Sequence, residues 1–133
     1  MTIALIAEDA KKELMVQFCI AYCGILNRHN ILATGSTAKM VSEATGLNIM
    51  GFLGGAQGGT QQISSRIGCD EIDMILLFRD TNSLSGSTVD CNELLRLCDV
   101  HNIPVATNIA TAEILIRGLE RGDLDWRDIV KSK

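Results

Sequence analysis

The sequence predicts an α/β fold, a three-layer sandwich in which helices cover both faces of a five-stranded parallel sheet. Short apolar runs alternate with amphipathic stretches from one end of the chain to the other, which is the pattern of strands joined by crossover helices. Apolar residues make up 47% of the chain against 21% charged, a balance typical of a folded globular protein. The length of 133 residues suits one domain, which we expect to span residues 1–133.

Five short apolar runs are the expected strands, and the stretches between them are long enough for helices of three to four turns. The expected strands are Ile3–Ala7, Ile31–Thr34, Ile49–Leu53, Asp73–Phe78 and Pro104–Thr107. Aromatic residues make up only 4% of the chain, so we expect an aliphatic core.

Amphipathic stretches predict five helices. The expected helices are Lys11–Asn27, Ser36 or Thr37 to Thr45 with Gly46 as the stop, Thr60–Ile67, a stretch that holds Leu94 to His101, and Ala110–Arg121. Glycine at the end of the second helix fits the left-handed conformation in which many helices end.

Charge and composition exclude several classes of partner. The net charge is -4 and Lys and Arg form no stripe, so we expect no nucleic-acid partner. No apolar run approaches the roughly 20 residues of a membrane span, and no signal-peptide core follows Met1, so we expect no membrane partner and a cytoplasmic location. The five cysteines form an odd set with no CxxC pair and no His at metal-site spacing, which predicts reduced thiols and no metal site. We also expect no cofactor.

The turn Thr34-Gly35-Ser36-Thr37 is the strongest candidate for a binding site. It follows an expected strand and opens an expected helix, so free backbone amides, the positive end of the helix and three hydroxyls meet at one point. That combination fits a phosphate group. The alternative is an ordinary helix N-cap formed by Ser36 or Thr37, without a ligand.

Other polar residues follow expected strands, where ligands of parallel sheets bind. Asp9 and Lys12 face one site if a helix begins between them, and otherwise form an exposed ion pair without a role. Asp80 ends the fourth strand, and Asp90 lies near the start of a helix, where a structural role at the positive helix end is equally good. The run Gly54–Gly59 holds four glycines, which permit close approach of the main chain to a ligand or form a flexible surface loop.

Taken in order, several short motifs resemble those of the methylglyoxal synthase family, and the match covers nearly the whole chain. The motifs are Ile3-Ala4-Leu5-Ile6-Ala7, Ala33-Thr34-Gly35, Ser42-Glu43-Ala44-Thr45-Gly46, Gly58-Gly59, Gln61-Gln62, Leu94-Leu95-Arg96 and Asn102-Ile103-Pro104-Val105-Ala106-Thr107-Asn108, and the tail over 119–126 is similar to clostridial-type members. The resemblance implies a five-stranded parallel sheet, a homohexamer, and a lyase that removes phosphate from dihydroxyacetone phosphate to give methylglyoxal.

The resemblance also implies roles for individual residues. It assigns phosphate or substrate binding to Lys12, Thr34, Ser36, Thr37, Gly54, Gly55 and Asp80. Asp9, Asp80 and Asp90 match acidic positions of the family's site, and Asp9 and Asp90 are the candidates for catalysis.

The reacting end of the site departs from the family. The reaction needs a base that takes a proton from the carbon next to a carbonyl. The family's base is the aspartate of a Gly-Gly-Asp-Gln-Gln motif, and Thr60 stands at that position. Ser87 stands where the family has a histidine, Glu8-Asp9 replaces its His-Asp pair, and Gly54-Gly55-Ala56 replaces its Ser-Gly-Pro. A threonine hydroxyl is protonated at neutral pH, so the expected base is absent.

Three hypotheses follow for the function. The first is a methylglyoxal synthase-like protein that binds phosphate or a small phosphorylated metabolite with weak or lost lyase activity, because the phosphate turn is intact and the base is missing. The second is an enzyme, either a methylglyoxal synthase that uses Asp9, Asp90 or Glu8 as a substitute base, or a lyase for another phosphorylated substrate. The third is a structural subunit of a larger assembly.

Overall fold

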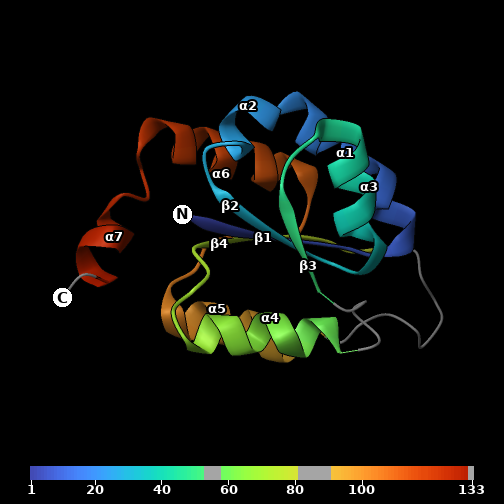
Figure 1. Ribbon diagram of the computed structural model, residues 1–133. Helices are drawn as coiled ribbons and strands as arrows, with labels where there is room; N and C mark the ends of the chain where they lie inside the picture. Colours follow the sequence, from blue (N-terminus) through green and yellow to red (C-terminus); the bar gives the residue numbers. More distant parts are fainter. Residues whose placement is uncertain (53–57, 81–90, 132–133) are drawn as a thin grey trace.

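The computed structural model describes residues 1–52, 58–80 and 91–131, and Figure 1 shows a central sheet between two layers of helices. The three-layer α/β fold that the sequence predicts is confirmed. Some predicted positions lie outside the described residues: Gly54, Gly55, Ser87 and Asp90, and also Leu53 at the end of the third expected strand.

The sheet has five parallel strands in the order β3-β2-β1-β4-β5. The strands are β1 (Thr2–Ala7), β2 (Asn30–Thr34), β3 (Ile49–Phe52), β4 (Met74–Phe78) and β5 (Val105–Ala106). Parallel pairing joins β1 to both β2 and β4, β2 to β3, and β4 to β5. Each expected strand has a counterpart, and the ends agree to within one residue.

Helices cover both faces of the sheet (Figure 1). One face carries α1 (Lys12–Ala21), α2 (Cys23–Leu26), α3 (Gly35–Thr45) and α6 (Ile109–Arg121), and the other carries α4 (Gly59–Gly68) and α5 (Asn92–His101). A short 3-10 helix (Asp9–Lys11) precedes α1, and α7 (Trp126–Lys131) follows α6.

The expected first helix, Lys11–Asn27, is divided in the structure, so that prediction is wrong. The chain leaves helical geometry at Tyr22, whose φ of -111° and ψ of 22° separate α1 from α2. Gly24 lies two residues after Tyr22, as the second residue of α2, and glycine lowers the stability of a helix. Gly46 ends α3 with a φ of +75°, in the left-handed conformation that the sequence predicts.

Strand side chains alternate between two apolar clusters, because successive residues of a strand point to opposite faces. The cluster beneath α1, α3 and α6 includes Ile3 and Leu5, and the cluster beneath α4 and α5 includes Ala4 and Ile6. Both are mainly aliphatic, as the low aromatic content predicts. A sheet that is buried on both faces leaves the ends of its strands as the place for polar groups.

Helix α7, which the sequence analysis does not predict, is fixed to the amino end of the sheet by a buried arginine. Arg127 Nε donates to Asp73 Oδ1 at 3.2 Å, and Arg127 Nη1 donates to the Asn102 carbonyl at 2.6 Å. The side chains of Arg127 and Asp73 are 5% and 6% exposed. Asp73 Oδ2 also accepts from the Thr2 amide at 2.9 Å, so this ion pair joins α7 to the first strand.

The strand order reverses at β1. The chain proceeds from β1 to β2 and β3 on one side, and then crosses to β4 and β5 on the other. In an open parallel sheet the crevice for a ligand lies outside the carboxyl ends of the strands at such a point. The residues that follow β1 and β4 therefore flank the expected binding crevice.

Candidate functional site

Two acidic residues meet at the carboxyl ends of β1 and β4, where the strand order places the expected crevice. Glu8 follows β1, and its amide donates to the Phe78 carbonyl at 3.0 Å, so the pairing of the two strands continues past Ala7. Glu8 Oε1 accepts from the Asp80 amide at 3.2 Å. Asp80, a predicted binding residue, therefore lies beside Glu8.

The turn from Thr34 to Thr37, the Thr34 turn below, joins β2 to α3 at the same edge of the sheet. Thr34 is the N-cap of α3 in an extended conformation, and its side chain makes no hydrogen bond to the helix. Gly35 has a φ of +53°, a left-handed conformation that suits glycine. The alternative prediction, an ordinary cap formed by Ser36 or Thr37, is wrong because the cap position belongs to Thr34.

The hydroxyls of the Thr34 turn differ in their surroundings. Ser36 Oγ accepts a hydrogen bond from Lys12 Nζ at 2.8 Å. Thr34 is buried, and Thr37 is 1% exposed, with no hydrogen-bond partner for its Oγ1 in the part of the chain that the structure describes. A buried hydroxyl without a partner is destabilising by about 1–3 kcal/mol. The turn therefore keeps a polar group that no other described residue satisfies.

Lys12 brings a positive charge to the Thr34 turn from the start of α1. Its Nζ lies 2.7 Å from Asp9 Oδ1 as well as 2.8 Å from Ser36 Oγ. The hydrogen bond from Lys12, together with its charge, lowers the pKa of the Asp9 carboxyl. The structure thus brings Asp9, Lys12 and Ser36 together, with a carboxylate that is held in its ionised form.

Thr60 is the second residue of α4, on the other face of the sheet from α3. It is 5% exposed, and among the described residues its Oγ1 has no hydrogen-bond partner. Gly58, the N-cap of α4, has a φ of +108°, so the chain enters this helix through a conformation that favours glycine. A threonine here offers no group that can take up a proton at neutral pH.

The contact between Glu8 and Asp80 was not predicted from the sequence. The register of the sheet is the signal that would have found it. Ala7 pairs with Phe78, so the residues directly after them lie side by side at the carboxyl edge. A prediction of strand order, and not only of strand positions, was needed to bring them together.

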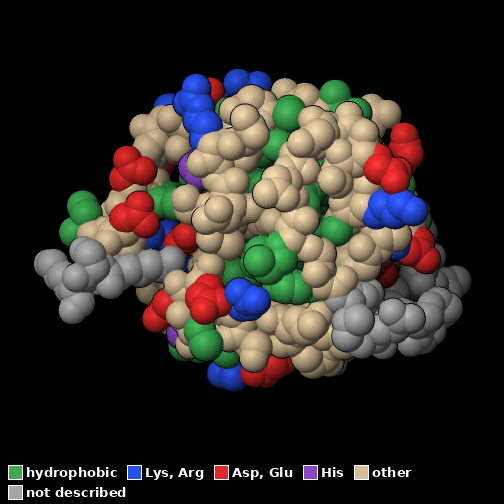
Figure 2. Space-filling model, viewed as in Figure 1, with side chains coloured by type: hydrophobic (Ala, Val, Ile, Leu, Met, Phe, Trp, Pro, Cys, Tyr) green, Lys and Arg blue, Asp and Glu red, His purple; other side chains and the backbone are tan. Residues whose placement is uncertain are grey.

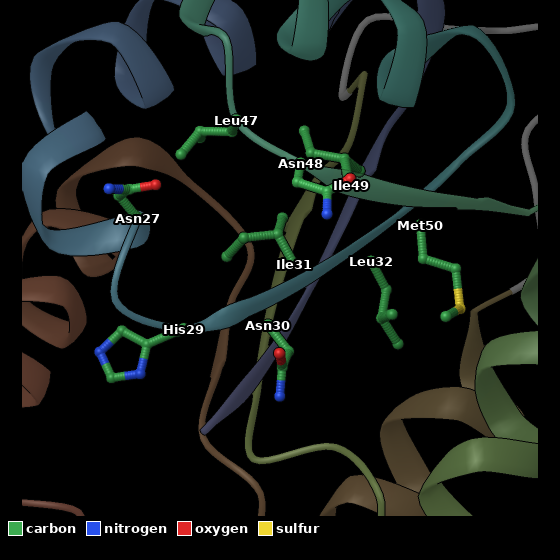
Figure 3. Close-up of a pocket in the computed structure, with 9 residues that line it drawn as sticks. All are labelled: Asn27, His29, Asn30, Ile31, Leu32, Leu47, Asn48, Ile49 and Met50. Carbon is green, nitrogen blue, oxygen red and sulfur yellow. The ribbon is translucent and has the colours of Figure 1, made fainter.

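A separate hollow of about 580 Å³ lies at the amino ends of β2 and β3 (Figure 3). It is lined by Asn27, His29, Asn30, Ile31, Leu32, Leu47, Asn48, Ile49 and Met50. None of these residues is a lysine, arginine or carboxylate, and burial lowers the pKa of His29, which favours its neutral form. This hollow therefore lacks the fixed positive charge with which proteins commonly bind phosphate groups.

Cys19, Cys91 and Cys98 are buried, whereas Cys23 is half-buried and Cys69 is exposed. All five are free thiols. Burial raises the pKa of Cys19 to about 12 and that of Cys98 to about 11, so both stay protonated at neutral pH. In the ranges 1–52, 58–80 and 91–131, no group of three or more His, Cys, Asp or Glu side chains is arranged to hold a metal ion.

The surface in Figure 2 has charges of both signs interspersed, and on this face Lys and Arg form no continuous basic stripe. A nucleic-acid surface would need such a stripe. Within the described part of the chain, no helix has both the length and the apolar character needed to cross a membrane.

Known proteins resemble this chain over most of its length. Residues 15–107 match the MGS-like domain family. The chain is 59% identical over 133 residues to a methylglyoxal synthase of Caldicellulosiruptor saccharolyticus and 53% identical to one of Oceanobacillus iheyensis, and it covers 94% and 95% of those proteins. The crystal structure of methylglyoxal synthase from Elizabethkingia anophelis NUHP1 matches with a TM-score of 0.82 at 36% identity, over 86% of this chain and 76% of that one. This chain therefore belongs to the methylglyoxal synthase family.

Proposed function

We propose that this protein binds a small phosphorylated metabolite at the Thr34 turn and acts on it as a carbon–oxygen lyase of the methylglyoxal synthase type. The proposed substrate is dihydroxyacetone phosphate, which loses phosphate to give methylglyoxal. Relatives that are 53% and 59% identical carry the name methylglyoxal synthase. They support turnover better than they support the first hypothesis of the sequence analysis, binding with weak or lost activity.

The contact of Lys12 with Ser36 carries this proposal. A phosphate at the Thr34 turn would meet the free amides and positive end of α3, and these groups favour an anion. Lys12 Nζ lies 2.8 Å from Ser36 Oγ, so an ammonium group is held at the same place. The hydroxyl of Thr37, which has no partner among the residues that the structure describes, offers one more donor within the turn.

A second candidate function, binding without turnover, is favoured by Thr60. The lyase reaction begins with removal of a proton from carbon, and a positioned base contributes about 10² to 10⁴ to the rate of such a step. The buried threonine in α4 cannot supply this base. The sequence analysis offers Asp9, Asp90 and Glu8 as substitutes for this base, and Asp90 lies outside the described residues.

Two measurements on the purified protein separate these functions. A colorimetric assay follows methylglyoxal formed from dihydroxyacetone phosphate, and calorimetric titration measures the binding of inorganic phosphate. We expect phosphate binding and product above the buffer control. Binding without product would favour the second candidate, and activity gained by a Thr60→Asp variant would then show that only the base is lacking. No binding and no product would overturn both functions.

The proposal includes a homo-oligomer, with a hexamer as the expected state, and a cytoplasmic location. Both are expectations that follow from the resemblance to the methylglyoxal synthase family. Light scattering after gel filtration measures the mass directly. A mass six times the 14.4 kDa of one chain is expected, and a monomer would contradict the hexamer.

A further inference from the structure

We infer that Glu8 is the general base of this site, in place of the carboxylate that Thr60 lacks. This inference rests on the proposed lyase function. Three acidic residues in the described part of the chain follow β1 and β4: Glu8, Asp9 and Asp80. Their contacts and the direction in which each leaves its strand distinguish Glu8 from Asp9.

Asp9 forms an ion pair with Lys12. Its Oδ1 lies 2.7 Å from Lys12 Nζ, and its side chain is 97% exposed. The hydrogen bond and the charge of Lys12 lower the pKa of this carboxyl, which makes it a weaker base. Asp9 therefore serves the phosphate end of the site, where it positions the ammonium group beside Ser36.

Glu8 leaves the sheet on the other side, towards α4. Ile6 belongs to the apolar cluster beneath α4 and α5, and Ala7 belongs to the opposite cluster. Glu8 has an extended backbone with a φ of -70° and a ψ of 158°, so the alternation of the strand continues and returns its side chain to the α4 side. This is the side on which α4 carries the buried Thr60.

Thr34 connects Glu8 to the phosphate turn. Leu32 belongs to the same cluster beneath α4 and α5, so Thr34, two residues later in β2, also projects to that side. β1 and β2 are neighbours in the sheet, with Leu5 opposite Ala33. A substrate whose phosphate lies at the start of α3 would therefore extend its carbon chain towards Glu8 across one strand spacing of about 4.8 Å.

The Glu8 carboxylate accepts one hydrogen bond that orients it, and it forms no ion pair with a described residue. Its Oε1 accepts from the Asp80 amide at 3.2 Å, while Oε2 has no partner among the described residues. No described lysine or arginine forms an ion pair with Glu8, and the sequences of 53–57 and 81–90 contain neither residue. A fixed carboxylate with one open oxygen suits proton transfer.

The proposed step removes a proton from the hydroxyl-bearing carbon of dihydroxyacetone phosphate. The Glu8 carboxylate takes this proton, and the C–H electron pair becomes the double bond of an enediolate. That pair then moves to the next carbon–carbon bond as the C–O bond to phosphate breaks, and the hydroxyl proton leaves with the phosphate. Glu8 returns its proton to the carbon that lost phosphate, which becomes the methyl group of methylglyoxal, so no oxidant or reductant is needed.

A Glu8→Gln variant tests this role, because it keeps an oxygen that can accept from the Asp80 amide but cannot take up a proton. Glu113→Gln, in an exposed position of α6, is the matched control. Each protein is assayed for methylglyoxal formation, for exchange of the substrate's carbon-bound protons in heavy water by NMR, and for phosphate binding by calorimetry. Circular dichroism and thermal unfolding report whether the variants are folded.

We expect Glu8→Gln to lower both turnover and proton exchange by about 10²- to 10⁴-fold, with phosphate affinity within about twofold of wild type. Glu8→Asp, which keeps the carboxylate on a shorter stem, should retain more exchange than Glu8→Gln. Glu113→Gln should match wild type. If Glu8→Gln fails to fold, Glu8→Ala takes its place as the variant without a carboxylate, and proton exchange equal to wild type in that variant would overturn the role of Glu8.

The outcomes separate this inference from the proposed function. If Glu8→Gln keeps the turnover of wild type, the inference is overturned and the lyase function stands. If Glu8→Gln loses phosphate binding, the inference is likewise overturned, because Glu8 then acts in binding, and the lyase function stands. Proton exchange without methylglyoxal, abolished by Glu8→Gln, would overturn the lyase function and support Glu8 as a base. Neither exchange nor product in wild type would overturn both.

Discussion

Replacing Lys12 by methionine is expected to weaken phosphate binding about 10- to 150-fold. Lys12 contacts the Thr34 turn directly, with Nζ 2.8 Å from Ser36 Oγ, and its side chain is only 20% exposed. A hydrogen bond to a charged group contributes about 1.5–3 kcal/mol, and about 1.4 kcal/mol corresponds to a tenfold change in Kd. Methionine preserves the unbranched stem, so packing at the start of α1 should be kept.

The remaining carboxylate of Asp9 makes the expected loss depend on salt. Without Lys12, the negative charge of Asp9 stands unpaired beside the bound phosphate, and this repulsion is screened as ionic strength rises. Calorimetric titration of phosphate at low and high ionic strength measures both effects. We expect the larger loss at low salt, and partial recovery when Asp9→Asn is added to Lys12→Met.

Lys39→Met is the matched control for this loss of charge. Lys39 lies on α3, the helix that the Thr34 turn opens, but its side chain is 78% exposed and its Nζ is 4.0 Å from Glu43 Oε1. An exposed pair of this kind contributes little, so phosphate affinity should stay within about twofold of wild type. Equal affinity for Lys12→Met and wild type, or an equal loss in both lysine variants, would refute the placement of the phosphate at the Thr34 turn.

Three further predictions concern stability. Arg127→Met should lower the free energy of unfolding by about 3–5 kcal/mol in urea denaturation, because Asp73 keeps a buried charge without its partner, and a loss below about 1 kcal/mol would contradict this role. Burial lowers the pKa of His29, so the unfolded chain binds more protons than the folded chain once pH falls below about 6.5. The free energy of unfolding of wild type should therefore fall from pH 7.5 to 5.5 relative to that of His29→Gln. Parallel curves of unfolding free energy against pH would contradict this prediction. Gly46→Ala should cost about 1–2 kcal/mol through its φ of +75° alone, since a Cβ there meets no atom within 4 Å, and unchanged thermal unfolding would show that the strain is relieved.

The strands were predictable because both faces of the sheet are covered by helices. A strand of this kind reads as a continuous apolar run, as in Met74–Phe78, and needs no alternating pattern. The limits of β5 were less clear, since it contains only Val105 and Ala106. Pro104 was predicted as part of this strand, and its carbonyl does accept from the Ile75 amide at 3.0 Å. The pairing with β4 therefore extends one residue beyond the assigned strand.

Helix α7 escaped prediction because its anchor is not local. Arg127 and Asp73 are 54 residues apart in the sequence, and no local sequence pattern indicates that they form a pair. The six residues of α7 also form too short a stretch for a clear apolar period. Long-range ion pairs of this kind become visible only when the packing of the elements is known.

The part of the site that could be predicted from the sequence is the part whose polar groups lie in consecutive residues. The Thr34 turn has its hydroxyls and its helix start within four consecutive residues, so one strand end and one helix start were enough to find it. Lys12 lies 24 residues from Ser36, and its place beside the turn came from the resemblance to a family. The roles of Gly54, Gly55 and Asp90 stay predictions, because these residues lie outside the described part of the chain.

Strand alternation gives the neighbours Glu8 and Asp9 different surroundings. The two carboxyls are adjacent in the chain, yet the extended backbone at Glu8 sends its side chain towards α4, while Asp9 opens the helical segment that carries Lys12. One carboxylate is therefore paired with a cation at the phosphate turn, and the other has an oxygen without a partner in the described part of the chain, on the side of Thr60. On the resemblance to the family, Thr60 stands where an aspartate is expected and Glu8 stands where a histidine is expected, so this sequence exchanges one carboxylate for another at the carboxyl ends of the strands.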